Sequence, residues 1–142
     1  MASFSKTSLE RLSQCHTDLQ VLGREVIKVH DCTVVTGYRN EAEQQKMYDD
    51  KLSRVLFPDS NHNDMPSKAI DLAPYVPSMG GLTYDREYGL YFSGIVLATA
   101  DRLYACGLMA HKLRWGGNWS TNRNKTFKNV NFYDGLHYEL KM

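Results

Sequence analysis

The sequence predicts an α+β fold in which a small sheet packs against helices. Segments whose apolar residues recur at helical spacing come before and between short β-branched or apolar runs. These runs do not alternate regularly with the helices, as the strands of a parallel sheet would. A chain of 142 residues suits one hydrophobic core. We therefore expect a single domain over residues 1–142, with no separate binding domain.

Local signals predict the elements of the first half. Thr7 and Glu10 fit a capping box, with Thr7 as the N-cap of a first helix. A second helix is predicted over about 18–29, where apolar residues share one face. The β-branched run 32–36 is predicted to be a strand. A second capping box opens a third helix over 40–48.

The middle of the chain is predicted to contain two loops, a strand and a helix. The loops are expected over 52–68 and 74–85, which are rich in Pro, Asn, Asp and Gly, and the apolar run 69–73 between them is typical of a buried strand. The helix ends near Gly107, a natural C-cap. Its apolar stripe, in which we expect the cysteine to be buried, consists of Phe92, Ile95, Val96, Thr99, Leu103 and Cys106.

Two further strands are predicted over 113–115 and 136–140, on either side of a polar, Asn-rich loop. No acidic residue occurs between Arg102 and Tyr133, while several basic residues do. This run is either a basic face for an anionic polymer or a solvated loop region.

The composition is that of an ordinary globular protein, with 42% hydrophobic and 23% charged residues. A formal net charge of +1 gives no support for nucleic-acid binding. The three cysteines are far apart, which argues against a disulfide framework. No signal peptide and no membrane span are expected, since the chain has neither an apolar N-terminal region nor a long apolar run. We therefore expect synthesis in the cytosol.

Two segments far apart in the chain carry residues that bind metals in proteins. His62 and Asp71 lie in the first segment, and Asp134 and His137 lie in the second. Two imidazoles and a carboxylate make a three-ligand zinc site with one position open for water. A further carboxylate nearby can act as a general base. This combination points to hydrolysis.

Each of these residues also has an ordinary structural interpretation. His62 lies in a polar, Pro-flanked loop, where histidines are usually solvated. Asp71 interrupts an apolar run, where a carboxylate has to be paired, used as a cap or bound to metal. The spacing of Asp134 and His137 is common by itself. The joint pattern, and no single residue, favours the metal site.

Five motifs surround these residues: Thr36-Gly37-Tyr38-Arg39-x-x-x-x-Gln44, Ser60-x-His62, Pro66-Ser67-x-Ala69-x-Asp71-Leu72-Ala73-Pro74-Tyr75, Trp115-Gly116-Gly117-x-Trp119 and Asp134-Gly135-x-His137-x-Glu139-Leu140. Together, and in this order, they resemble the phage branch of the VanY-type D-alanyl-D-alanine carboxypeptidase family of metallopeptidases. The resemblance spans nearly the whole chain.

The resemblance implies a LAS/hedgehog-like metallopeptidase scaffold with a small antiparallel sheet and one zinc ion per chain. The zinc ligands that it implies are His62, Asp71 and His137. It further implies Asp134 as the catalytic base and Arg39 as the group that holds the scissile carbonyl oxygen. The chemistry agrees, because zinc lowers the pKa of its water to about 7 and arginine suits an oxyanion. An ion pair with Glu43 is the structural alternative for Arg39.

Four other residues are weaker candidates for substrate binding or for support of the metal site. Ser60 either orients a ligand or caps a loop. Gln44 belongs to the motif of Arg39. Trp115 and Trp119 either line a substrate groove or pack within the protein.

The chain departs from its relatives in two places. The segment between His62 and Asp71 is longer than the usual H-x-x-x-x-x-x-D and carries Pro66-Ser67. Asn118 stands where relatives often have Asp, in a loop without acids. Since calcium prefers carboxylate and other oxygen ligands, no calcium site is predicted in loop 116–133.

The function implied by the resemblance is that of an endolysin that cleaves the L-Ala–D-Glu bond of the peptidoglycan stem peptide. The expected protein is a monomer that neither binds nucleic acid nor inserts into membranes, and that reaches the wall from the host cytoplasm after the membrane is permeabilised. One alternative is a D-Ala-D-Ala carboxypeptidase or dipeptidase. Another is a zinc-bearing binding module without catalysis, although Asp134 and Arg39 together favour an enzyme.

Overall fold

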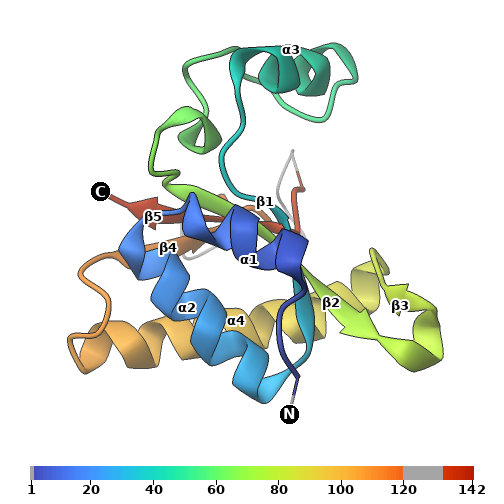
Figure 1. Ribbon diagram of the computed structural model, residues 1–142, viewed down its shortest axis with the longest axis vertical. Helices are drawn as coiled ribbons and strands as arrows, with labels where there is room; N and C mark the ends of the chain where they lie inside the picture. The colour runs from blue at the N-terminus through green and yellow to red at the C-terminus, as the bar shows by residue number, and fades with distance from the viewer. Residues whose placement is uncertain (1, 120–132) are drawn as a thin grey trace.

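The computed structural model describes residues 2–119 and 133–142. Figure 1 shows helices around one small sheet. The helices are α1 (Lys6–Ser13), α2 (Thr17–Val29), α3 (Glu41–Asp49) and α4 (Arg86–Ala105), with short 3-10 turns η1 (Asn61–Asn63) and η2 (Pro77–Met79). The strands are β1 (Cys32–Thr36), β2 (Ala69–Val76), β3 (Gly81–Leu82), β4 (Lys112–Trp115) and β5 (His137–Lys141).

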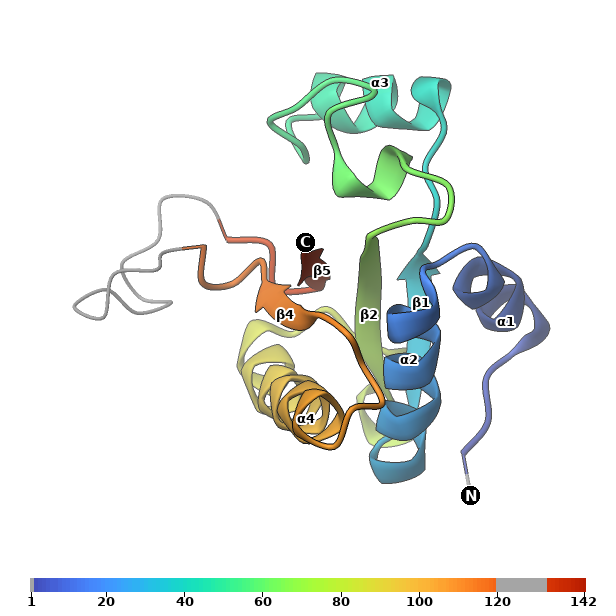
Figure 2. The same cartoon turned by 90° about the vertical axis from the view of Figure 1, so that its left-hand side faces the viewer.

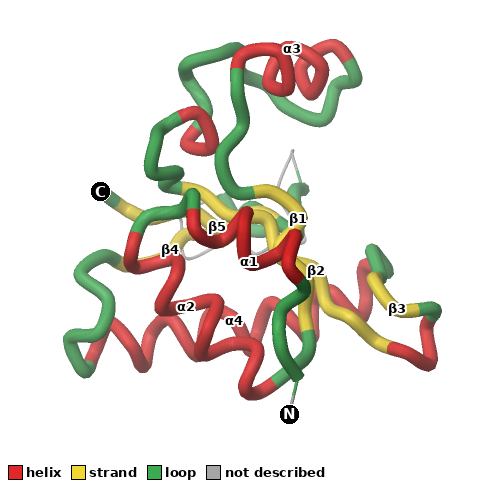
Figure 3. Tube along the Cα trace, in the orientation of Figure 1, coloured by secondary structure: helices red, strands yellow, loops and turns green. Residues whose placement is uncertain are grey.

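The sheet has the order β1-β2-β5-β4, and β3 pairs with the far end of β2. All of these pairs are antiparallel. The predicted α+β class with a small antiparallel sheet is therefore confirmed. In Figures 1 and 2, α3 lies at the top, apart from the other helices. Figure 3 shows that a loop connects it to β1, and that a second connection, which contains η1, leads to β2.

The two faces of the sheet have different roles. Ile70 and Leu72 of β2 are fully buried and belong to the hydrophobic core, whereas Asp71 between them lines a cleft. Tyr138 of β5 is likewise in the core, and His137 is in the cleft. Because side chains alternate along a strand, one face packs on the helices and the other can carry polar groups. The core also contains Leu19, Leu22 and Val26 of α2 and Phe92, Val96 and Leu103 of α4.

Most of the elements form where local signals predict them. The strand Cys32–Thr36 is confirmed, and the capping box of α3 forms between Asn40 and Glu43. The last strand begins within one residue of the predicted position.

The N-cap predicted for the first helix is wrong. The helix begins two residues earlier, and Ser5 is its N-cap, accepting a hydrogen bond from the backbone N–H of Ser8 at 3.2 Å. The hydroxyl oxygen of Ser8, inside the helix, accepts a hydrogen bond from the backbone N–H of Val34, and this bond joins α1 to β1.

The loop predicted over 74–85 is wrong at its start, because β2 continues to Val76 and β3 follows. Pro74 has no N–H to donate, but its carbonyl accepts from the N–H of Thr83 at 3.1 Å, so pairing continues past it. The burial predicted for Cys106 is also wrong, since this residue is exposed. It is the C-cap of α4, followed by Gly107 with a φ of 78°, so it lies beyond the last turn that faces the core.

Candidate active site

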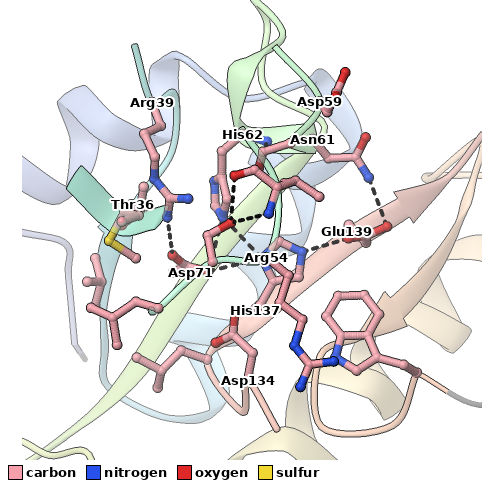
Figure 4. A pocket seen from close by; sticks show the side chains of 18 of the residues that line it. Thr36, Arg39, Arg54, Asp59, Asn61, His62, Asp71, Asp134, His137 and Glu139 are labelled. Carbon is pink, nitrogen blue, oxygen red and sulfur yellow. Dashed lines mark hydrogen bonds and ion pairs between the residues drawn. The ribbon is translucent and has the colours of Figure 1, made fainter. Parts of the chain in front are cut away.

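Strand pairing brings two of the predicted metal ligands together. Asp71 of β2 lies directly opposite His137 of β5 in the antiparallel register, so both side chains project from the same face of the sheet. His62 comes from η1, a separate segment that passes over this face, and Figure 4 shows the three side chains converging. All three residues are buried.

The three candidate ligand atoms form a nearly equilateral triangle. His62 Nε2 lies 3.1 Å from His137 Nδ1 and 3.2 Å from Asp71 Oδ1, and the last two atoms are 3.3 Å apart. A tetrahedral zinc ion with bonds of about 2.0–2.1 Å requires its ligand atoms to be about 3.3–3.4 Å apart. The residues therefore fit a zinc ion, which would have one coordination position left for water.

The hydrogen bonds of the two histidines aim a lone pair of each at the same point. His62 Nδ1 lies 2.8 Å from the carbonyl oxygen of Gly37, to which it can only donate. His137 Nε2 lies 2.7 Å from Glu139 Oε1, which accepts a hydrogen bond from that nitrogen. The other ring nitrogen of each histidine is then the acceptor in the neutral form. This tautomer pattern is characteristic of metal-binding histidines.

Glu139 and Asn61 support the site, although the sequence motifs assign no role to either residue. Glu139 accepts a hydrogen bond from Asn61 Nδ2 at 2.8 Å, in addition to its contact with His137. The spacing His137-x-Glu139 in a predicted strand was the available signal, because alternate residues share a face. No local signal identifies Asn61, whose partner lies 78 residues away in the chain.

The charges of the cluster compensate one another. Burial would raise the pKa of Asp71, but the charge of His62 and a hydrogen bond from His137 hold it well below the usual range. Burial would lower the pKa of His137, but hydrogen bonds to Asp71 and Glu139 raise it to about 10. Without a metal, the cluster therefore holds a proton where a cation would sit.

Asp134, the predicted base, lines the same cleft. Its backbone is fixed at both ends, because its N–H donates to Gly116 and its carbonyl accepts from the N–H of His137. Burial raises the pKa of its carboxyl to about 6, with a further contribution from the charge of Asp71. A carboxyl group with a pKa near neutrality is suited to accept and return a proton.

Arg39 is buried at the edge of the metal cluster. Its Nη2 lies 3.5 Å from Asp71 Oδ2, and its Nη1 donates to Gln44 Oε1 at 3.1 Å. The alternative of a surface ion pair with Glu43 is wrong, since the Glu43 carboxylate accepts from the backbone N–H of Asn40 in the capping box. The guanidinium lines the cleft beside the metal ligands.

The four weaker candidates have different roles: two support the site residues by hydrogen bonds, one belongs to the core and one lines the cleft. Ser60 caps η1, since its hydroxyl oxygen accepts from the N–H of His62 at 3.2 Å. Gln44 is fully buried and bonded to Arg39. Trp115 belongs to the core and donates to the carbonyl of Gly135, so it does not line the groove. Trp119 does line the cleft, with its ring centroid 5.4 Å from that of His137.

The cleft has a volume of about 750 Å³. One wall comes from the sheet and the other from the segment after α3. This space is large enough for a short peptide.

A second group of potential ligands, formed by His16, Asp18 and His111, differs from the first. Asp18 Oδ2 already accepts hydrogen bonds from the backbone N–H groups of Ala110 and His111 and contacts His111 Nδ1 at 2.9 Å. His16 Nδ1 accepts from the N–H of Asp18. Asp18 Oδ2 is therefore used in joining the start of α2 to the loop before β4, which makes this group less suited to a metal than the first.

Two predictions lie partly outside the described residues. The proposed absence of calcium concerns loop 116–133, of which 120–132 are not described. Three of the six basic residues of the run from Arg102 to Tyr133 lie in the same undescribed stretch. Among the described residues, no helix has the length and hydropathy that a membrane span requires.

Comparisons with known proteins bear on the family and on the fold of the chain. A family model described as phage L-alanyl-D-glutamate peptidase matches residues 1–141. Among solved structures, the L-Ala D-Glu endopeptidase ChiX of Serratia marcescens is similar, with a TM-score of 0.70 and 24% sequence identity over 98% of this chain and 90% of that one. At this identity the likeness establishes the fold. No curated protein matches the chain.

Proposed function

We propose that this chain, which belongs to the phage L-alanyl-D-glutamate peptidase family, is a zinc-dependent endopeptidase. Membership of that family makes it a peptidase that acts on the L-Ala–D-Glu bond of peptidoglycan, and not a binding module. The similar Serratia structure is described as an L-Ala D-Glu endopeptidase, which supports the same bond.

The convergence of three ligand atoms carries the proposal of zinc. His62, Asp71 and His137 offer two nitrogens and one oxygen at the separations that a tetrahedral ion requires. Calcium is a poor fit, since it takes six to eight oxygen ligands. Bound zinc would supply Lewis-acid chemistry, lowering the pKa of a water to about 7 and polarising a carbonyl group.

Two residues of the chain complete the mechanism. Asp134 takes the proton of the attacking water and returns it to the amine of the leaving D-glutamate. Arg39 directs N–H groups at the scissile carbonyl oxygen, where negative charge develops. Gln44 and Asp71 hold its guanidinium in place, so little reorganisation is needed during the reaction.

We also propose the biological setting. The protein serves as an endolysin that lyses the host, acting as a monomer of one domain on the stem peptide. It accumulates in the host cytoplasm and reaches the periplasmic side of the membrane after another agent permeabilises it. Neither nucleic acid nor a membrane takes part in its activity.

Digestion of purified peptidoglycan tests the scissile bond. We expect mass spectrometry to find muropeptides that end in L-alanine, together with peptides that begin with D-glutamate. Release of free D-alanine from an intact L-Ala–D-Glu stem would instead identify a D-Ala-D-Ala carboxypeptidase. Elemental analysis of the dialysed protein tests the metal, and we expect about one zinc per chain, lost in His137→Ala.

A further inference from the structure

The identity of the scissile bond, which rests on the proposed function, imposes a requirement on the cleft. Glutamate has two carboxyl groups, and a linear peptide uses only one of them to continue the chain. The other is a free carboxylate on the leaving side of the L-Ala–D-Glu bond. Taking this charge out of water is costly unless the cleft provides a cation or several donors. The cleft therefore needs a positive group beyond those that act on the scissile carbonyl.

Three cations line the described part of the cleft, namely Arg39, Lys51 and Arg54. Arg39 is buried and held by Asp71 and Gln44 next to the ligands, where it serves the scissile carbonyl. Arg54 is exposed and comes from the opposite wall, in the segment between α3 and η1. In Figure 4 its side chain extends into the cleft on the side of His137 and Asp134.

The residues on both sides of Arg54 are hydrogen-bonded to one buried side chain. Gln44 Nε2 donates to Ser53 Oγ at 3.0 Å and to the carbonyl of Val55 at 2.7 Å. Gln44 Oε1 accepts from Arg39 Nη1 at 3.1 Å. One fully buried amide thus connects the residues before and after Arg54 to the guanidinium beside the metal cluster. The starting point of the Arg54 side chain is therefore fixed relative to the reacting centre.

We propose that Arg54 binds the free carboxylate of the D-glutamate and so determines specificity on the leaving side of the bond. A guanidinium is suited to this role because its forked N–H groups bind a carboxylate through two parallel hydrogen bonds. Arg39 and Arg54 then divide the work. Arg39 faces the oxygen of the scissile carbonyl, and Arg54 recognises the acid that distinguishes glutamate from neutral residues.

Two matched peptides test this assignment. Both contain the L-Ala–D-Glu bond, but one has the free carboxylate and the other has an amide in its place. We expect the wild type to cleave the acid with a kcat/KM about 10- to 100-fold above that of the amide, since a hydrogen-bonded charge is lost in the amide. Arg54→Gln should lower kcat/KM for the acid to about the level of the amide, so that the preference between the two peptides disappears.

Two further variants separate charge, geometry and position. Arg54→Lys keeps the charge without the fork, and we expect a smaller preference than in the wild type. Lys51→Gln, which removes the other cation of this wall, should keep the full preference. Zinc content and melting temperature of all variants should equal those of the wild type, because both side chains are exposed.

The assignment is overturned if Arg54→Gln keeps the wild-type preference, or if the wild type cleaves the two peptides equally. In either case cleavage itself still supports the proposed function. A wild type that cuts neither peptide, although loaded with zinc, would overturn the proposed function and this inference together.

Discussion

The carboxyl group of Asp134 is not part of the ligand triangle, and this separation defines its role. The closest ligand atoms belong to His62, Asp71 and His137, while Asp134 lines the cleft beside them. Its raised pKa, caused first by burial and then by the charge of Asp71, agrees with a group that exchanges protons. It should therefore be removable without loss of the metal.

We expect Asp134→Asn to lower wall lysis by about 100- to 10,000-fold, the usual contribution of a general base. Zinc content and melting temperature should stay unchanged. Turbidity of substrate cells measures lysis, and elemental analysis measures the metal. Asp59→Asn, which removes an exposed carboxyl from the same cleft, is the control and should keep activity. Lysis by Asp134→Asn at the wild-type rate would place the base elsewhere.

The proton on metal-free His137 predicts how zinc binding depends on pH. Its pKa is about 10, because hydrogen bonds to Asp71 and Glu139 outweigh the effect of burial. The proton has to leave before Nδ1 can bind zinc, so binding at neutral pH should release about one proton and strengthen as pH rises. Calorimetric titrations in two buffers of different ionisation enthalpy measure this release. Equal heats in both buffers would contradict it.

The same pKa contributes to the pH dependence of the stability of the metal-free protein. A pKa raised above the unfolded value of about 6.5 stabilises the fold fully below that pH. This contribution is lost as pH rises through about 10. The metal-free protein should therefore lose stability as pH rises from about 6.5 to about 10.

At the scale of elements, one carboxylate joins the two segments that carry the histidines. Glu139 of β5 accepts hydrogen bonds from His137 on its own strand and from Asn61 of η1. The cross-strand position opposite it is occupied by Arg114 of β4. Burial alone would raise the pKa of Glu139, but the hydrogen bond from His137 and the charge of that residue lower it, so it stays ionised.

Glu139→Gln should weaken zinc binding by about 10- to 100-fold, as expected for the hydrogen-bond partner of a metal-binding histidine. The substitution keeps the shape of the side chain but removes its charge, and a second amide then faces the amide of Asn61. Competition with a chromophoric chelator measures the affinity. Glu41→Gln, on the exposed surface of α3, is the matched control. Unchanged affinity in Glu139→Gln would show that Glu139 only packs beside the site.

Several elements could be predicted because their signals are local. The strand Cys32–Thr36 follows from a β-branched run, and α3 begins at the capping box that its sequence contains. The start of α1 was misplaced because Ser5 and Thr7 are both favourable N-cap residues, and the capping-box pattern with Glu10 favoured Thr7. The continuation of β2 through Pro74 depends on Thr83, which reaches it only after the chain has turned back.

At the scale of the whole molecule, the candidate metal site connects segments that are far apart in the chain. It joins η1 to β2 and β5, over the face of the sheet that carries no hydrophobic core. A ligand that binds only the native state stabilises it by mass action. Zinc should therefore be structural as well as catalytic.

We expect a chelator to lower the melting temperature by about 10 °C. Zinc at 100 times its Kd contributes about 2.7 kcal/mol, and each kcal/mol shifts Tm by about 4 °C in a protein of this size. Differential scanning calorimetry before and after verified zinc removal measures the shift. It should persist in His111→Ala, which disrupts the second histidine group, and disappear in His137→Ala. An unchanged melting curve would limit the metal to catalysis.

The sequence by itself determined the fold class, because periodicity and capping are local properties. Its metal-binding residue types pointed to His62, Asp71, Asp134 and His137, and the resemblance of its motifs added Arg39. The structure places these five residues in one cleft. Only the tertiary structure decided the partners of these residues. The bond between Asn61 and Glu139, the anchoring of Arg54 through Gln44 and the burial of Trp115 in the core join segments distant in sequence. Such contacts depend on strand register and on how loops pack, which no local pattern specifies.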